Sequence, residues 1–209
     1  MHDVDEALER GLGELGLPLP GRAKEQLLAY LALLGKWNRT YNLTAIRDPL
    51  TMVSHHLLDS LAVRPHLPAG TLADIGSGGG LPGIPLAIAE PERRVTVNDA
   101  NQKKASFLRQ VIIELRLGNA DVHEGRVQAW KPSQRFACVI ARGVAALSEL
   151  LADSAHLLAP GGVLAAMKGT LRDEELGRPM AGFDCRDVRR LSVPLLDAER
   201  HLVLCRPAA

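Results

Sequence analysis

A glycine-rich segment, residues 74–83 (DIGSGGGLPG), has the composition of a loop that holds a cofactor. It follows a short apolar run and enters a helix through Pro82 and Pro85, where missing N–H groups do little harm. Glycines in such a loop let the backbone adopt positive φ and approach a ligand closely. At the end of the first strand of a doubly wound sheet, this loop would lie at the ligand crevice. The sequence therefore predicts a cofactor site here.

Two glycine patterns overlap in this loop. A GxGxxG pattern at residues 78–83, with Asp99 following its first glycine by 21 residues, fits a dinucleotide site, where a ribose-binding acid is expected ~20 residues on. A GxGxG pattern at residues 76–80, preceded by an acid, fits an S-adenosylmethionine loop. The acid can bind the cationic methionyl amino group but would repel a pyrophosphate, which favours the second pattern. Its candidate cofactor residues are Asp74, Gly76, Gly78 and Gly80.

The ends of the next predicted strands add further candidates. Asp99 can bind ribose hydroxyls, although an acid there also suits a helix N-terminus. Residues 125–128 follow the third strand and can offer the Val127 N–H and the Gln128 amide to an adenine edge. Arg142 ends the fourth strand, where a transferred methyl group would lie.

Motifs that the sequence lacks reduce the number of methyl-transfer reactions that it fits. An Asn/Asp-Pro-Pro-aromatic loop, typical of exocyclic-amine methylation, is replaced by the sequence ARGV at residues 141–144. Methylation of pyrimidine C5 needs a cysteine nucleophile, but Cys138 falls inside a predicted buried strand, where it fits a small core residue. Guanine N7 already has a free lone pair, so its methylation requires orientation and exclusion of water rather than a base. The sequence favours guanine N7.

The composition indicates an ordinary globular protein. The chain has 209 residues, 46% of them hydrophobic, and no run approaches the roughly 20 apolar residues that span a bilayer. Three widely spaced cysteines, Cys138, Cys185 and Cys205, without a CxxC motif, predict neither a disulfide nor a metal site and favour a reducing cytoplasm. The net charge of +1 means that RNA binding would require basic residues gathered on one face.

The order of predicted elements indicates an α/β fold with an N-terminal helical extension. Residues 1–70 are predicted helical, with one helix opening at Asp48-Pro49 and stopping before Pro65. A later helix is capped by Asn101 and ended by Gly118. Strands are expected at residues 71–75, 95–98, 120–123, 137–141, 163–167, 185–193 and 201–206.

Alternation of the first five strands with helices predicts parallel pairing, and the short link between the last two predicts an antiparallel hairpin. This arrangement is that of class I S-adenosylmethionine-dependent methyltransferases: Rossmann-like, with a mostly parallel seven-stranded sheet and an antiparallel last strand. We expect residues 1–70 to form the extension and residues 71–209 to form the methyltransferase domain as one compact unit.

Several motifs resemble the RsmG (GidB) family of bacterial 16S rRNA guanine-N7 methyltransferases. The resemblance covers roughly residues 30–206 in order, without a large gap. Its most specific segments are NLTAIR at residues 42–47, HLLDS at 56–60, the loop at 74–85, FLRQ at 107–110 and ERHLV at 199–203. Small departures are Asn98, where an apolar residue is usual, and Gln128, where the family often has an acid.

The resemblance implies methyl transfer from S-adenosylmethionine to a loop guanine of 16S rRNA, usually numbered 527, in free rRNA or in the small ribosomal subunit. It implies cofactor contacts at Gly76, Leu81, Val127, Gln128 and Arg142. Nothing in the sequence demands more than a monomer.

The residues that would position the guanine are open, and the candidates are Arg142, His56 and Asn42. His56 could instead pair locally with Asp59 on one helix, and Asn42 could simply form a turn. The RNA-binding candidates, some of which could equally form a solvated helix face, are Arg47, Lys103, Arg109, Arg126, Lys168 and Arg200. Two other functions remain open: methylation of a small metabolite, which the near-neutral charge suits, and an NAD(P)-binding reductase. A reductase should carry a Tyr-x-x-x-Lys proton donor, which the sequence lacks.

Overall fold

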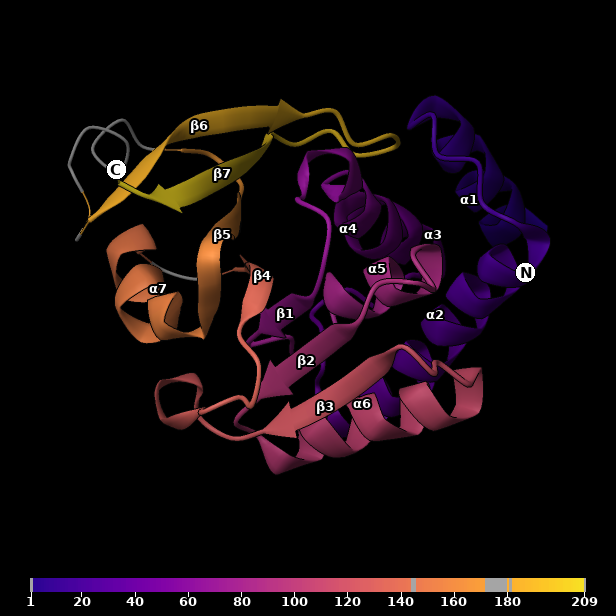
Figure 1. Ribbon diagram of the computed structural model, residues 1–209. Helices are drawn as coiled ribbons and strands as arrows, with labels where there is room; N and C mark the ends of the chain where they lie inside the picture. Colours follow the sequence, from indigo (N-terminus) through magenta and orange to yellow (C-terminus); the bar gives the residue numbers. More distant parts are fainter. Residues whose placement is uncertain (1, 144–145, 172–179, 181, 209) are drawn as a thin grey trace.

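The computed structural model of the chain describes residues 2–143, 146–171, 180 and 182–208. A seven-stranded sheet in the order β3-β2-β1-β4-β5-β7-β6 runs through the molecule (Figure 1). Its strands are β1 (Leu72–Ile75), β2 (Val95–Asp99), β3 (Ala120–Glu124), β4 (Phe136–Arg142), β5 (Leu158–Lys168), β6 (Phe183–Leu191) and β7 (Arg200–Pro207).

Pairing in the sheet follows the predicted class. The first five strands are parallel, whereas β7 runs antiparallel to both β5 and β6. The chain moves outward from β1 to β2 and β3 and then returns to place β4 on the other side of β1. The carboxyl ends of β1 and β4 therefore flank the switch point at which open α/β sheets bind their ligands.

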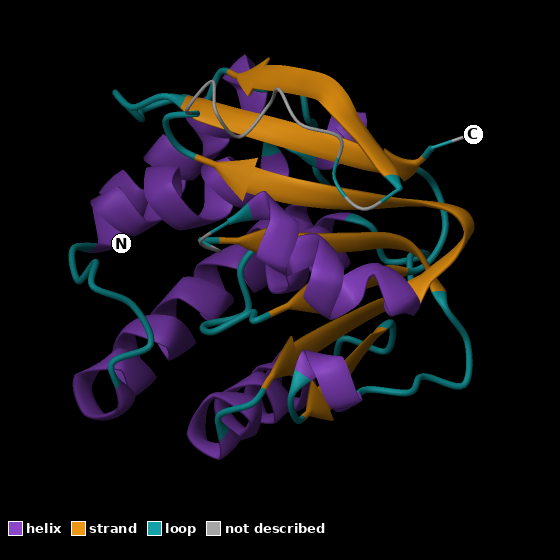
Figure 2. Ribbon diagram, turned by 90° about the vertical axis from the view of Figure 1, so that its left-hand side faces the viewer, coloured by secondary structure: helices purple, strands orange, loops and turns teal. Residues whose placement is uncertain are grey.

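Helices cover both faces of the sheet (Figure 2). One face packs against α1 (His2–Glu14), α2 (Gly21–Tyr41), α5 (Gly83–Ala89) and α6 (Gln102–Leu115), and the other against α7 (Leu147–Ser154). The helical segments between α2 and β1 are α3 (Pro49–Met52), the π-helical turn η1 (Val53–Leu58), α4 (Asp59–Leu61) and the 3-10 turn η2 (Arg64–His66). Two further 3-10 turns are η3 (Val127–Ala129) and η4 (Ala155–Leu157).

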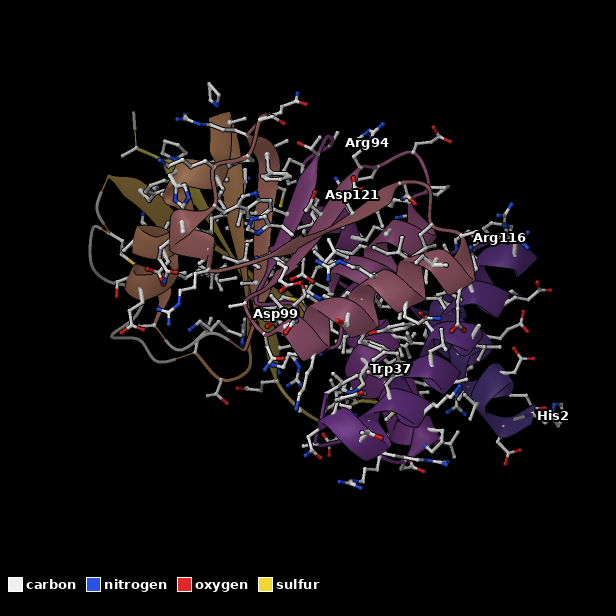
Figure 3. All side chains as sticks on the ribbon, turned by 90° about the horizontal axis from the view of Figure 1, so that it is seen from below. His2, Trp37, Arg94, Asp99, Arg116 and Asp121 are labelled. Atoms are coloured by element: carbon white, nitrogen blue, oxygen red, sulfur yellow. A yellow bond between two sulfur atoms is a disulfide. The ribbon has the colours of Figure 1, made fainter. Side chains whose placement is uncertain are left out.

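The N-terminal helices share a core with the sheet. Leu8 of α1 and Leu27 of α2 are fully buried in the same cluster as Ile84 of α5 and Phe107 of α6. Trp37, near the end of α2 in Figure 3, has its ring centroid 5.5 Å from that of Phe107. The division of the chain at residue 70 stays a prediction.

Both predicted helix starts are confirmed. Asp48 Oδ2 accepts a hydrogen bond from the Thr51 N–H at 2.7 Å, with proline in the first turn. Asn101 Oδ1 accepts from the Lys103 and Lys104 N–H groups at 2.9 and 3.3 Å. The segment opened at Asp48 is not one regular helix, however, because its middle widens into the π-helical turn η1.

The predicted end of α6 at Gly118 is wrong. The left-handed residue is Arg116, with φ 52°, and the Leu117 N–H bonds to the Ile112 carbonyl at 3.0 Å. These contacts form a Schellman motif. Its left-handed position is occupied by Arg116 instead of glycine, and burial of the next residue, Leu117, in the core stabilises the turn.

The terminal strands correct one expectation about the cysteines. Cys185 of β6 and Cys205 of β7 form a disulfide, with their Cα atoms 4.1 Å apart. A shift of register between Asp184 and Asp187 brings Cys185 across from Cys205, a pairing that their spacing in the sequence does not reveal. Cys138 is buried in β4, as its place in the sequence predicts.

Two findings concern the described part of the chain as a whole. None of its helices has the length and apolar character needed to span a bilayer. No group of three or more His, Cys, Asp or Glu side chains in the described ranges could hold a metal ion.

Candidate functional site

The glycine loop that follows β1 contains glycines of two kinds. Gly76 (φ 64°) and Gly78 (φ 59°) are accessible, and a Cβ atom added to either would meet nothing within 4 Å. A Cβ on Gly80 (φ 91°) would instead lie 2.6 Å from Ile84 Cγ1 and 2.9 Å from Leu108 Cδ2. Gly76 and Gly78 therefore leave the backbone open to a ligand, whereas Gly80 permits close packing.

Side chains from α2, β1 and β2 fix this loop. The Gly79 carbonyl accepts a hydrogen bond from the hydroxyl of Tyr30, a buried residue of α2, at 2.6 Å. The Gly78 N–H donates to Asp99 Oδ2 at the end of β2, at 2.9 Å. The Gly83 N–H donates to Asp74 Oδ2 at 2.8 Å. The extension and the first two strands thus hold the loop together.

Asp74 lies beneath the loop rather than on its surface. Its side chain is fully buried, and its Oδ1 atom has no hydrogen-bond partner. Burial raises the pKa of this carboxyl to about 7, although the hydrogen bond from Gly83 favours the charged form. A Cβ on Gly83 would approach Asp74 Oδ2 to 2.7 Å, so only glycine fits there. Asp74 therefore acts on the loop from below, through the Gly83 N–H.

The side chain of Asn98 joins the ends of β2 and β3. Its Nδ2 atom lies 2.9 Å from His123 Nδ1 and donates to the Gly125 carbonyl at 2.8 Å. The neighbouring Asp99, visible at the start of α6 in Figure 3, also accepts from the Asn101 N–H at 2.8 Å. Asn98 thus positions the loop after β3 through hydrogen bonds.

A small cavity of about 170 Å³ opens between the ends of β1 and β3 and helix α7. The predicted residues Gly76 and Val127 both line it, together with Ile75, Ala146, Glu149, Leu150 and Asp153. Gln128 is exposed, and its Nε2 atom donates to Asp153 Oδ2 at 2.8 Å. Leu81, another predicted contact, is buried under the loop.

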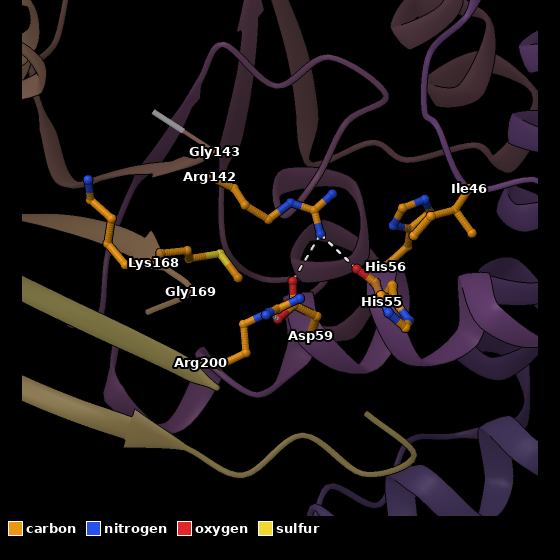
Figure 4. A pocket seen from close by; sticks show the side chains of 10 residues that line it. Ile46, His55, His56, Asp59, Arg142, Gly143, Lys168, Gly169 and Arg200 are labelled. Carbon is orange, nitrogen blue, oxygen red and sulfur yellow. Dashed lines mark hydrogen bonds and ion pairs between the residues drawn. The ribbon is translucent and has the colours of Figure 1, made fainter. Parts of the chain in front are cut away.

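A second cavity, of about 450 Å³, lies at the carboxyl ends of β4 and β5 (Figure 4). Two candidates from the sequence, Arg142 and His56, line it from different elements. The remaining lining residues are Ile46, His55, Asp59, Gly143, Met167, Lys168, Gly169 and Arg200.

Asp59 joins two arginines at this second cavity. Its Oδ2 accepts from Arg142 Nη1 at 3.0 Å, and its Oδ1 accepts from Arg200 Nε at 2.9 Å. Only 3% of the Asp59 side chain is exposed, against 23% of each arginine. The predicted local pair between His56 and Asp59 is therefore wrong, because both carboxylate oxygens are bound to arginines from distant strands.

The π-helical turn η1 supplies a further contact. In an α-helix the Asp59 N–H would bond to the His55 carbonyl, but here it bonds to Ser54 and His56. The His55 carbonyl accepts from Arg142 Nη1 at 2.9 Å instead. The widened turn thus makes a backbone acceptor available to the arginine that ends β4.

His56 is neutral at physiological pH. Burial, with a smaller effect of the nearby Arg142 charge, lowers its pKa to about 4. Its Nε2 atom lies 2.9 Å from the Thr44 hydroxyl, which also accepts from the Ile46 N–H at 3.1 Å. This histidine connects the 42–47 loop to η1. Asn42 is exposed at the end of α2, with φ 50°, and lines neither cavity described above.

The RNA-binding candidates lie mostly near the carboxyl ends of the strands. Lys168 and Arg200 line the second cavity. Lys103 and Arg126 are exposed at the start of α6 and after β3, while Arg47 is exposed in the loop before α3. Arg109 Nη1 forms an ion pair with Glu124 Oε2 at 2.9 Å. Residue 144 of the predicted ARGV segment lies outside the described residues.

Two functional contacts were not predicted from the sequence. In the sequence, Tyr30 belongs to an apolar stripe at helical spacing, and its hydroxyl group is the feature that indicates a polar partner. Asp59 belongs to the HLLDS motif, but its arginine partners lie 83 and 141 residues further along the chain.

The fold and the site together define a class I methyltransferase. Parallel strands with an antiparallel final pair carry a glycine loop after β1 and an acid after β2. Among solved structures, the S-adenosylmethionine-dependent methyltransferase SibL in its apo form matches with a TM-score of 0.59. That match covers 83% of this chain and 62% of SibL at 18% identity, and it shows a shared fold.

The family follows from sequence comparison. The family model GidB, described as rRNA small subunit methyltransferase G, matches residues 23–203. The ribosomal RNA small subunit methyltransferase G of Methylobacillus flagellatus is 50% identical over 96% of this chain and 97% of its own length. Its namesake in Stenotrophomonas maltophilia is 51% identical over 96% and 93%, respectively. The chain therefore belongs to the GidB family.

Proposed function

We propose that this protein transfers a methyl group from S-adenosylmethionine to N7 of a guanine in 16S rRNA, the base usually numbered 527. The observation that carries the proposal is the position of the two cavities. The first is lined by Gly76 after β1, and the second, which carries three basic side chains, is lined by Arg142 and Gly143 after the neighbouring strand β4. A cofactor in the first can present its methyl group to a base in the second.

The residues of the first cavity fit the cofactor. The open faces of Gly76 and Gly78 allow close approach of the methionyl part, and Asp99 lies where ribose hydroxyls would bind. Val127 lines the place for the adenine edge and Gln128 is exposed next to it, while Asp74 holds the loop from below through the Gly83 N–H. When bound, S-adenosylmethionine supplies a methyl group on a positively charged sulfonium centre.

Chemistry at N7 needs little beyond orientation. The lone pair of N7 attacks without prior loss of a proton, so the protein must align the base and exclude water. His56, with its pKa near 4, is uncharged and adds no positive charge to the cavity. Arg142 Nη1 is held by the His55 carbonyl and Asp59, which fixes the guanidinium at the wall of the second cavity. We propose Arg142 as a contact of the cofactor and a positioning group for the guanine.

Basic residues around the second cavity suit an RNA substrate in spite of the low net charge. A volume of about 450 Å³ accommodates a base that has been splayed out of its loop. Lys168 and Arg200 can bind the flanking phosphates, with Arg47, Lys103, Arg109 and Arg126 further out. We propose that the protein acts as a monomer in the cytoplasm, where its ribosomal substrate is located.

Methyl transfer from radiolabelled S-adenosylmethionine tests the proposal. The acceptors are 16S rRNA and small subunits from a strain that lacks this modification, and subunits that already carry it serve as the matched control. We expect label on one loop guanine, released by cleavage chemistry specific for N7-methylguanine. Binding of S-adenosylmethionine without label on RNA would favour a small-molecule acceptor. Failure to bind the cofactor would overturn the assignment of the first cavity.

A further inference from the structure

We propose that Asp59 is a positioning residue of this site. Its carboxylate holds in place both Arg142, on the cofactor side, and Arg200, on the RNA side. The inference rests on the proposed function, since it assigns Arg142 to the cofactor and Arg200 to the RNA. Asp59 comes from the short helix α4, whereas its partners end β4 and begin β7. One side chain therefore ties together three elements that border the second cavity.

The geometry directs Asp59 toward the two arginines rather than toward the substrate. Each carboxylate oxygen already accepts a charge-assisted hydrogen bond, at 3.0 Å from Arg142 and 2.9 Å from Arg200. With 3% of its side chain exposed, Asp59 forms the base of the cavity, and the arginines form its walls. Its effect on the reaction must therefore act through them.

The arginines keep donors for a ligand. Asp59 engages Nη1 of Arg142 and Nε of Arg200, and the other described partners are the His55 and Glu199 carbonyls. A guanidinium has five N–H donors, so each arginine retains N–H groups that can reach into the cavity. Held by its edge, each guanidinium has a defined plane, which is what bidentate recognition of a carboxylate or phosphate requires.

The negative charge of Asp59 also offsets the repulsion between the two arginines. Without it, two guanidinium groups would line one cavity with no carboxylate between them. Asp59 neutralises one of these two positive charges and leaves the other for a ligand. A phosphodiester, with one negative charge, complements what remains.

The decisive variant is Asp59→Asn, which keeps the shape but replaces one acceptor with an amide that faces a guanidinium donor. We expect the Kd of S-adenosylmethionine, measured by calorimetry, to rise about tenfold, and the KM for small subunits to rise at least tenfold. Arg142→Gln should mainly raise the cofactor Kd, and Arg200→Gln mainly the RNA KM, so that Asp59→Asn combines the two defects. Asp121→Asn, an exposed carboxylate on β3 labelled in Figure 3, is the matched control and should change neither.

A double variant completes the test, because the effects of its two substitutions should not be additive. If Asp59 acts through Arg200, the variant Asp59→Asn/Arg200→Gln should have an RNA KM close to that of Arg200→Gln alone. The inference would be overturned if folded Asp59→Asn had the wild-type Kd and KM. It would also be overturned if the effects of the two substitutions on KM were fully additive in the double variant. Either result would leave the proposed function intact. If Asp59→Asn does not fold, a cofactor Kd in Arg200→Gln equal to that in Arg142→Gln would overturn the division into two sides. Absence of RNA methylation by the wild type would instead refute the proposed function, and the cofactor Kd would still test Asp59.

Discussion

Substitution of alanine for each of two glycines in the loop after β1 should separate cofactor binding from folding. Gly78 and Gly80 both have positive φ, 59° and 91°, but they differ in what surrounds them. A Cβ on Gly78 points into open space, whereas a Cβ on Gly80 would lie within 3 Å of Ile84 and Leu108. The two variants therefore share the backbone penalty and differ in the steric one.

The magnitudes follow from these contacts. A left-handed conformation costs an alanine about 1–2 kcal/mol relative to glycine. Overpacking adds about 1–3 kcal/mol at Gly80. For a chain of 209 residues each kcal/mol lowers Tm by about 2–4 °C. We expect a loss of about 2–8 °C for Gly78→Ala and of about 4–20 °C for Gly80→Ala.

Cofactor affinity should show the opposite order. A methyl group on Gly78 occupies space that the methionyl part would use, so we expect the Kd of S-adenosylmethionine to rise at least tenfold. For Gly80→Ala the Kd should change less than for Gly78→Ala. Thermal unfolding gives the stabilities, and calorimetry at 20 °C gives the affinities. An unchanged Kd in Gly78→Ala, or a larger stability loss there than in Gly80→Ala, would refute this interpretation of the loop.

Three further predictions concern the groups around the loop. Arg142→Ala should lower turnover at least tenfold while lowering Tm by only a few degrees; a loss of Tm in proportion to activity would show a purely structural role. Tyr30→Phe, which removes the hydrogen bond to the Gly79 carbonyl, should cost about 1–3 kcal/mol in urea unfolding and weaken cofactor binding; unchanged stability would contradict the anchoring role. Asp74→Asn should remove a pH dependence. Because burial raises the folded-state pKa to about 7, above the usual 3.8, Asp74 favours folding at low pH, and this contribution is lost as the pH rises from about 4 to 7. The variant should gain up to about 4 kcal/mol relative to wild type between pH 4 and pH 8, in urea unfolding at both pH values, whereas parallel curves would exclude the shifted pKa.

The fold was largely predictable because its signals are local. Alternation of short apolar runs with helix-period segments gives the parallel sheet, and the short link between the last two strands gives the antiparallel pair. Caps at Asp48 and Asn101 follow from the chemistry of a side chain and the N–H groups two or three residues later. The end of α6 was missed because the buried position of Leu117, and not a glycine, decides where the chain turns.

The site was predictable in its components but not in its connections. The sequence identifies the loop glycines and the acids at strand ends, because their spacing along the chain is itself the signal. The sequence does not distinguish the open Gly78 from the packed Gly80, because this difference depends on which glycine lies against Ile84 and Leu108. Likewise, the register shift in β6 that aligns Cys185 with Cys205 has no marker in the sequence.

By itself, the sequence determined the class of fold, the place of the glycine loop and the arginine at the end of β4. Tertiary structure decided that Tyr30 anchors the loop and that Asp59 joins Arg142 to Arg200. The physical reason is the range of the interactions. Backbone propensity and periodicity act over a few residues, whereas these hydrogen bonds join groups 49, 83 and 141 residues apart, which meet only when the sheet and its helices have packed.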